Sequence, residues 1–199
     1  MALTINRDLR RSAQTALAGK WTPAVLTTLV YMLLACVCSY IPYLNFPASL
    51  LVLPVLGFGY QVIFLNVMRS GNYPEINALF NGFHNYGKTL GTMLLAAIYT
   101  WLWSLLLVIP GIIKAYSYAM TPFILNDEPE LGADEVICKS MAMMRGHKMK
   151  LFLLDLSFIG WILLAILTLG IGFLWLVPWM ESARMAFYLD LKRNAQQEA

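Results

Sequence analysis

Four ionisable side chains lie inside long apolar stretches of the sequence: Lys114, Asp155, Glu181 and Arg184. A charged side chain at the centre of a bilayer costs about 2.5–3.5 kcal/mol on insertion scales, so such residues usually pair or line a functional site. Counting about 1.5 Å per helical residue from the charged end of each stretch places Lys114 at a depth near Glu181, and Asp155 near Arg184. Glu181 and Arg184 are also spaced i, i+3, which allows contact along one helix.

Together with Tyr116, these four residues form our candidate intramembrane polar site, which Tyr118, Ser117 and Ser157 would also line. In a functional interpretation, the site is a partly hydrated cavity that holds a lipid headgroup or an anion. In a structural interpretation, the same charges form a buried ion-pair network that fixes how the helices pack. The residue types fit both interpretations.

The composition is that of a membrane protein. The chain has 199 residues, of which 59% are hydrophobic and 13% are charged, and its mean hydropathy is +0.64. Soluble domains carry about 25% charged residues, so this chain has too few to cover a soluble globule. The three cysteines also exclude a small secreted fold held together by several disulfides.

A bilayer core of about 30 Å needs roughly 20 apolar residues of helix. Six candidate spans follow, at 22–41, 48–68, 90–109, 110–126, 151–169 and 171–191, with a turn at 42–47. The stretch 110–126 decides the topology, because it is short and contains a lysine. If it crosses the membrane, twelve of the 14 Lys and Arg residues fall on one side, which the positive-inside rule assigns to the cytoplasm. We therefore expect an all-α fold of about six transmembrane helices with both termini cytoplasmic.

The six spans read as three hairpins, each preceded by an amphipathic segment with one apolar face. These segments cover about 5–17, 76–83 and 134–148, and a similar proline lies in each hairpin, at Pro54, Pro110 and Pro178. We predict one membrane domain of three internal repeats, at 1–68, 69–126 and 127–193, followed by a short polar tail at 194–199. The amphipathic helices either lie in the interface near anionic headgroups or cover protein, and both alternatives stay open.

Several motifs resemble one family: GFHNYGKT at 82–89, LLLVIPGIIKAYSYAM at 105–120, SMAMMRGHK at 140–148, LFLLDLSFIGW at 151–161 and LTLGIGFLWLVP at 167–178. Over about residues 70–191 the chain resembles the bacterial multi-pass membrane proteins of domain-of-unknown-function family 975. Its layout is also similar to the membrane domain of some bacterial glycerophosphodiester phosphodiesterases. The resemblance implies a multi-pass protein of the bacterial cytoplasmic membrane. It implies no particular activity, because the family has none assigned.

Motifs of soluble enzymes are missing from the sequence, which contains no HExxH, GxSxG, Walker loop or paired-cysteine zinc pattern. We therefore expect no catalytic residues, no cofactor, no metal and no nucleic-acid partner. The expected partners are the phospholipid bilayer, anionic lipid headgroups or another membrane protein.

Three functions remain compatible with the sequence. The first is a non-catalytic membrane protein that organises the bilayer or assists or regulates a partner. The second is a transporter or lipid-translocating protein that uses the charged site, and the third is an intramembrane lipid enzyme. The missing catalytic motifs and the short outer turns favour the first.

Overall fold

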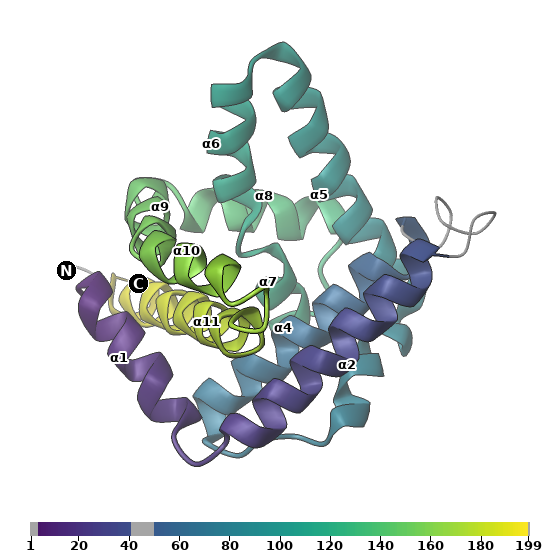
Figure 1. Cartoon of the computed structure of the whole chain (residues 1–199). Coiled ribbons are helices and arrows are strands. Elements are labelled where there is room, and N and C mark those ends of the chain that lie inside the picture. Colours follow the sequence, from purple (N-terminus) through teal and green to yellow (C-terminus); the bar gives the residue numbers. More distant parts are fainter. Residues whose placement is uncertain (1–3, 41–49, 199) are drawn as a thin grey trace. The chain divides into compact units, whose positions relative to one another are not determined.

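The computed structural model describes residues 4–40 and 50–198, and within them the chain is all-helical, without a strand (Figure 1). The elements are α1 (Asn6–Leu17), α2 (Trp21–Tyr40), α4 (Leu53–Ser70), the 3-10 helix η1 (Ile76–Phe83), α5 (Tyr86–Leu106), α6 (Val108–Tyr118), α7 (Thr121–Asp127), α8 (Ala133–Met143), α9 (Lys148–Leu156), α10 (Ile159–Leu167) and α11 (Phe173–Glu198). The predicted turn at 42–47 lies outside the described residues. The all-α prediction is confirmed.

The chain divides into two compact units, which we describe separately. The first unit contains Met1–Met32, Ile63–Ile76 and Met149–Ala199, and the second contains Leu33–Val62 and Asn77–Lys148. The division is not the one predicted for three repeats, and the repeats stay a prediction.

In the first unit, α1 packs along α11. The helix buries its apolar stripe of Leu9, Ala13 and Leu17 almost completely, while the arginines on its other face stay exposed or half-buried. Near its start, the Thr4 hydroxyl donates a hydrogen bond of 2.8 Å to the Asp190 carboxylate on α11. The sequence left open whether this amphipathic helix covers lipid or protein, and in the structure its apolar stripe is buried against protein.

In the second unit, α5 and α6 form a hairpin whose two helices lie side by side (Figure 1). The legs approach closely because residue 111 is glycine: a Cβ there would overlap Ser104 on the opposite leg. Helix α8 packs against α5, α6 and α7. The Ser140 hydroxyl on α8 donates a 2.8 Å hydrogen bond to the Ser117 carbonyl and accepts a 3.2 Å hydrogen bond from the Met120 amide. These two bonds hold the end of α6 in place.

Two of the predicted spans are broken helices. The stretch 110–126 is divided between α6 and α7, and the break precedes Pro122 in the first turn of α7, where a proline restricts the residue before it. The stretch 151–169 is divided between α9 and α10. There the Ser157 hydroxyl donates a 2.6 Å hydrogen bond to the Leu154 carbonyl at the break, and such back-bonding competes with regular helix geometry.

Three helical stretches among the described residues are long and apolar enough to cross a membrane: Trp21–Cys38, Val108–Asp127 and Lys148–Leu167. This is compatible with a membrane protein. The number of spans and the cytoplasmic position of the termini stay predictions.

Candidate functional site

Three of the five predicted site residues meet in the first unit. The guanidinium of Arg184 on α11 forms two parallel contacts with the Asp155 carboxylate on α9, Nε to Oδ1 and Nη2 to Oδ2, both 3.1 Å long. A third contact of 3.5 Å joins Arg184 Nη1 to Glu181 Oε1, one turn earlier on α11. Bidentate arginine–carboxylate pairs are among the strongest charge-assisted hydrogen bonds. Counting the helical rise along the sequence predicts that Asp155 lies beside Arg184, and the i, i+3 spacing predicts that Glu181 does so too. Both predictions agree with these contacts.

This cluster is partly buried and contains two carboxyl groups and one guanidinium. The side chains of Asp155 and Glu181 are 18% and 14% exposed, and that of Arg184 is 36% exposed. Within the described part of the chain, Glu181 Oε2 is buried and has no hydrogen-bond partner. Since one guanidinium serves both carboxylates, little of it is left to hold a further ligand. The geometry therefore favours the structural interpretation, a network that joins α9 to α11.

The other two predicted residues, Lys114 and Tyr116, lie on α6 in the second unit. The ammonium of Lys114 lies 4.6 Å from the centre of the Trp103 ring and 4.0 Å from the Met141 sulfur. An ammonium over an indole face is stabilised by a cation–π interaction. The predicted pair of Lys114 with Glu181 would join the two units and stays a prediction.

Sequence reasoning missed Trp103 as the partner of Lys114. The two residues belong to opposite legs of the hairpin that turns at Leu107, the single residue between α5 and α6. Pairing the legs about that turn would have brought them together. Along one continuous helix, however, eleven residues span about 16 Å, which is too far for contact, so a search for neighbours at i, i+3 and i+4 cannot find this pair.

The start of α2 lies near the tip of the third hairpin. Trp21 at that start and Gly172 at that tip line the same groove in the first unit, together with Thr168. The six-span prediction places Trp21 and Gly172 at opposite faces of the membrane. In the structure, α1 packs on α11 and α2 begins beside this groove. The number of spans stays a prediction.

The described residues contain no group of three or more His, Cys, Asp and Glu side chains that could hold a metal ion. Over the described residues, the fold and the charged cluster define an all-helical protein with three helical stretches apolar enough for a membrane and an ion-pair network that joins α9 to α11.

The chain belongs to the family described as protein of unknown function (DUF975), which matches residues 1–113 and 105–195. The match includes the N-terminal hairpin, which the motifs in residues 70–191 did not reach. No curated protein and no solved structure matches the chain, so the comparisons indicate no activity.

Proposed function

We propose that this chain is a non-catalytic protein of the bacterial cytoplasmic membrane that organises the bilayer by inserting helical hairpins into its cytoplasmic leaflet. The observation that carries the proposal is the apolar tip of the α5–α6 hairpin. No charged residue occurs between Lys88 and Lys114. Trp101, Leu105, Leu107, Val108 and Ile109 around the turn are each 65–73% exposed, which suits contact with lipid chains and opposes contact with water.

The backbone of this tip also suits hydrocarbon. A single extended residue, Leu107, joins α5 to α6. Its amide donates to the Trp103 carbonyl, and its own carbonyl accepts from the Gly111 amide, while Pro110 has no amide hydrogen to satisfy. Lipid-exposed backbone must satisfy its polar groups internally, and a turn this short leaves few of them open.

The depth of the tip supports insertion into one leaflet. The Tyr99 hydroxyl on α5 lies 3.2 Å from the Asp134 carboxylate at the start of α8, and the exposed face of α8 carries charged side chains. We therefore assign this level to the membrane surface. Leu107 follows Tyr99 by eight residues, which is about 12 Å of helix. The hydrocarbon core is about 30 Å thick. Figure 1 shows α5 and α6 extending beyond α8.

Such a hairpin turns back inside the bilayer, and the same basic segments stay cytoplasmic as in the six-span arrangement. The positive-inside argument therefore supports both arrangements equally, and the groove shared by Trp21 and Gly172 supports hairpins that do not cross. Helices that occupy one leaflet expand that leaflet relative to the other. We propose that the protein organises the membrane through this difference in leaflet area, which bends the bilayer.

The predicted three repeats fit this proposal. Helix α1 packs on α11 and α8 packs on α5 to α7, while a Cβ at Gly59 of α4 would overlap the carbonyl of Leu79 in η1. Each amphipathic segment thus lies against a hairpin helix of a different predicted repeat: α1 against 127–193, η1 against 1–68 and α8 against 69–126. The same kind of contact, an amphipathic helix packed on a hairpin helix, thus occurs three times. It supports one membrane domain in which surface helices stabilise inserted hairpins.

Reconstitution into vesicles of mixed zwitterionic and anionic phospholipid tests the function. We expect the chain to shrink or tubulate the vesicles in electron micrographs as the protein-to-lipid ratio rises. We also expect no flux of trapped anions and no lipid scrambling above the level of protein-free vesicles. Unchanged vesicle shape, together with a flux that Glu181→Gln abolishes, would contradict the proposal and favour the transporter.

A further inference from the structure

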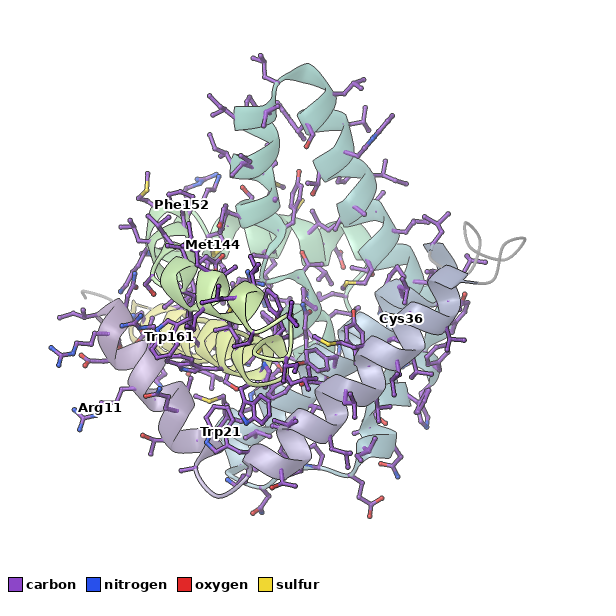
Figure 2. The ribbon with its side chains drawn as sticks, viewed as in Figure 1. Arg11, Trp21, Cys36, Met144, Phe152 and Trp161 are labelled. Atoms are coloured by element: carbon purple, nitrogen blue, oxygen red, sulfur yellow. The ribbon has the colours of Figure 1, made fainter. Side chains whose placement is uncertain are left out.

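A basic cleft lies along α1 in the first unit. It has a volume of about 470 Å³ and is lined by Arg7, Arg10, Arg11, Gln14, Trp161 and Trp179. In Figure 2, the Arg11 side chain projects away from the ribbon of α1. Three guanidinium groups within two helical turns give this cleft a strong positive charge.

No carboxylate of the described residues forms an ion pair with these three arginines. Asp8, the acidic residue of α1, lines a different cleft, which Arg11 also borders. Arg10 is fixed in place by neutral groups, because its Nη1 donates a 3.0 Å hydrogen bond to the Ser157 carbonyl and its guanidinium lies 5.7 Å from the centre of the Phe158 ring. The positive charge of the cleft is therefore available to a ligand.

An apolar groove continues directly from the basic cleft. It has a volume of about 320 Å³, and it shares Gln14, Trp161 and Trp179 with the cleft. Its other walls are apolar side chains of α10 and α11, Thr168 and Gly172 between these helices, and the indole of Trp21, which Figure 2 labels at the start of α2. These walls include Leu164, Trp175 and Leu176. Together the two volumes lie within the ordinary range of ligand sites, about 300–1,000 Å³.

Tryptophans form the border between the two parts. The indole of Trp179 packs edge-to-face on Trp161, with ring centres 5.4 Å apart, and its Nε1 donates a 3.1 Å hydrogen bond to the Arg10 carbonyl. This bond ties the border to the basic helix, so cleft and groove keep their alignment. Amphipathic indoles are enriched at the boundary between headgroups and hydrocarbon.

We infer that this paired cleft and groove binds one anionic phospholipid, with its phosphate at Arg7, Arg10 and Arg11 and an acyl chain along Leu164 and Trp175. Charge complementarity selects the headgroup, because arginine binds phosphate oxygens bidentately. The groove selects a ligand that carries a chain, which distinguishes the lipid from free phosphate. The inference deepens the proposed function by naming the lipid that the protein holds, although the site does not depend on how deeply the hairpins insert.

Tryptophan quenching by brominated lipid tests the site. Four of the six tryptophans line it, and Trp101→Phe with Trp103→Phe removes the other two. In vesicles of phosphatidylcholine, a small fraction of phosphatidylglycerol with brominated chains is expected to quench several-fold more than the same fraction of brominated phosphatidylcholine. Neither inorganic phosphate nor glycerol phosphate should reverse this quenching.

Two variants and two matched controls locate the effect. Replacing Arg7, Arg10 and Arg11 by glutamine should remove the preference for phosphatidylglycerol, whereas Arg193→Gln, an exposed arginine of α11 outside the cleft, should keep it. Leu164→Ser in the groove should also weaken it, whereas Leu163→Ser, an exposed neighbour outside the groove, should keep it. If the triple arginine variant does not fold, the comparison of the Leu164 and Leu163 variants tests the site.

Three outcomes would overturn the inference. Equal quenching by both brominated lipids would exclude a headgroup site, and reversal by inorganic phosphate would make it a phosphate site without a chain. Loss of preference in the Arg193 or Leu163 control would mean that the preference does not come from this cleft and groove. Any of these can occur while the vesicles still change shape, so failure here is distinguishable from failure of the proposed function.

Discussion

Replacing Leu107 by arginine is expected to remove most of the folded chain from membranes. If the tip of α5–α6 ends inside the bilayer, the new charge must be placed in hydrocarbon, which costs about 2.5–3.5 kcal/mol on insertion scales. Each 1.4 kcal/mol is a factor of ten in an equilibrium, so insertion of the hairpin falls by about two orders of magnitude. The measurement is the amount of monodisperse protein recovered from membranes after an alkaline wash.

Ile5→Arg is the matched control. Ile5 is 70% exposed and Leu107 is 67% exposed, but Ile5 precedes the surface helix α1 and should tolerate the charge. In a six-span protein, Leu107 would lie at the outer end of the 90–109 span, where an arginine side chain can reach the water of the far surface, so the charge would cost little. Equal recovery of the two variants would therefore contradict a tip buried in lipid.

Replacing Arg184 by leucine is expected to lower the free energy of unfolding by about 2–3 kcal/mol. Removing one partner of a fully buried ion pair costs about 3–5 kcal/mol, because a buried charge is left uncompensated. The expected loss is smaller here since the Arg184 side chain is about one third exposed, although two carboxylates lose their partner. Thermal or denaturant unfolding in detergent micelles measures the change.

The triple replacement of Asp155, Glu181 and Arg184 by leucine separates the two interpretations of the cluster. For a structural network, stability should recover to near that of the parent, because well-packed apolar groups often replace buried ion pairs without loss. The shape change in vesicles should also survive. A stable triple variant that no longer alters vesicles would instead show that the charges take part in the function.

Part of the candidate site could be predicted from residue spacing. Charges within apolar runs are few, and counting helical rise from the ends of two stretches placed Asp155 beside Arg184, as in the structure. The face of α1 was predictable too, because its apolar residues follow the helical period and Leu9, Ala13 and Leu17 are buried. Both results rest on local helix geometry, which the sequence carries directly.

Other features depend on how separate segments meet. The partner of Lys114 is Trp103 across a one-residue turn, and the basic cleft needs α1 to lie on α11, about 170 residues away, as the 169-residue separation of Arg10 and Trp179 shows. The breaks after α6 and α9 occur inside continuous apolar runs. Above all, the length of an apolar run does not determine its membrane topology. The same run can cross the bilayer or belong to a hairpin that turns back within it.

Labelling of single cysteines with a membrane-impermeant maleimide tests the central claim most directly. The three native cysteines, Cys36, Cys38 and Cys138, are first replaced. One cysteine is then introduced at Leu107 in the tip or at Glu130, an exposed residue between α7 and α8. Only a thiolate reacts, and a thiol in hydrocarbon does not ionise.

We predict that the Glu130→Cys variant is labelled from the cytoplasmic side alone. The Leu107→Cys variant should be labelled from neither side until detergent dissolves the membrane. Labelling of Leu107→Cys from the side opposite to Glu130→Cys would show that the hairpin crosses the membrane, and would contradict the account.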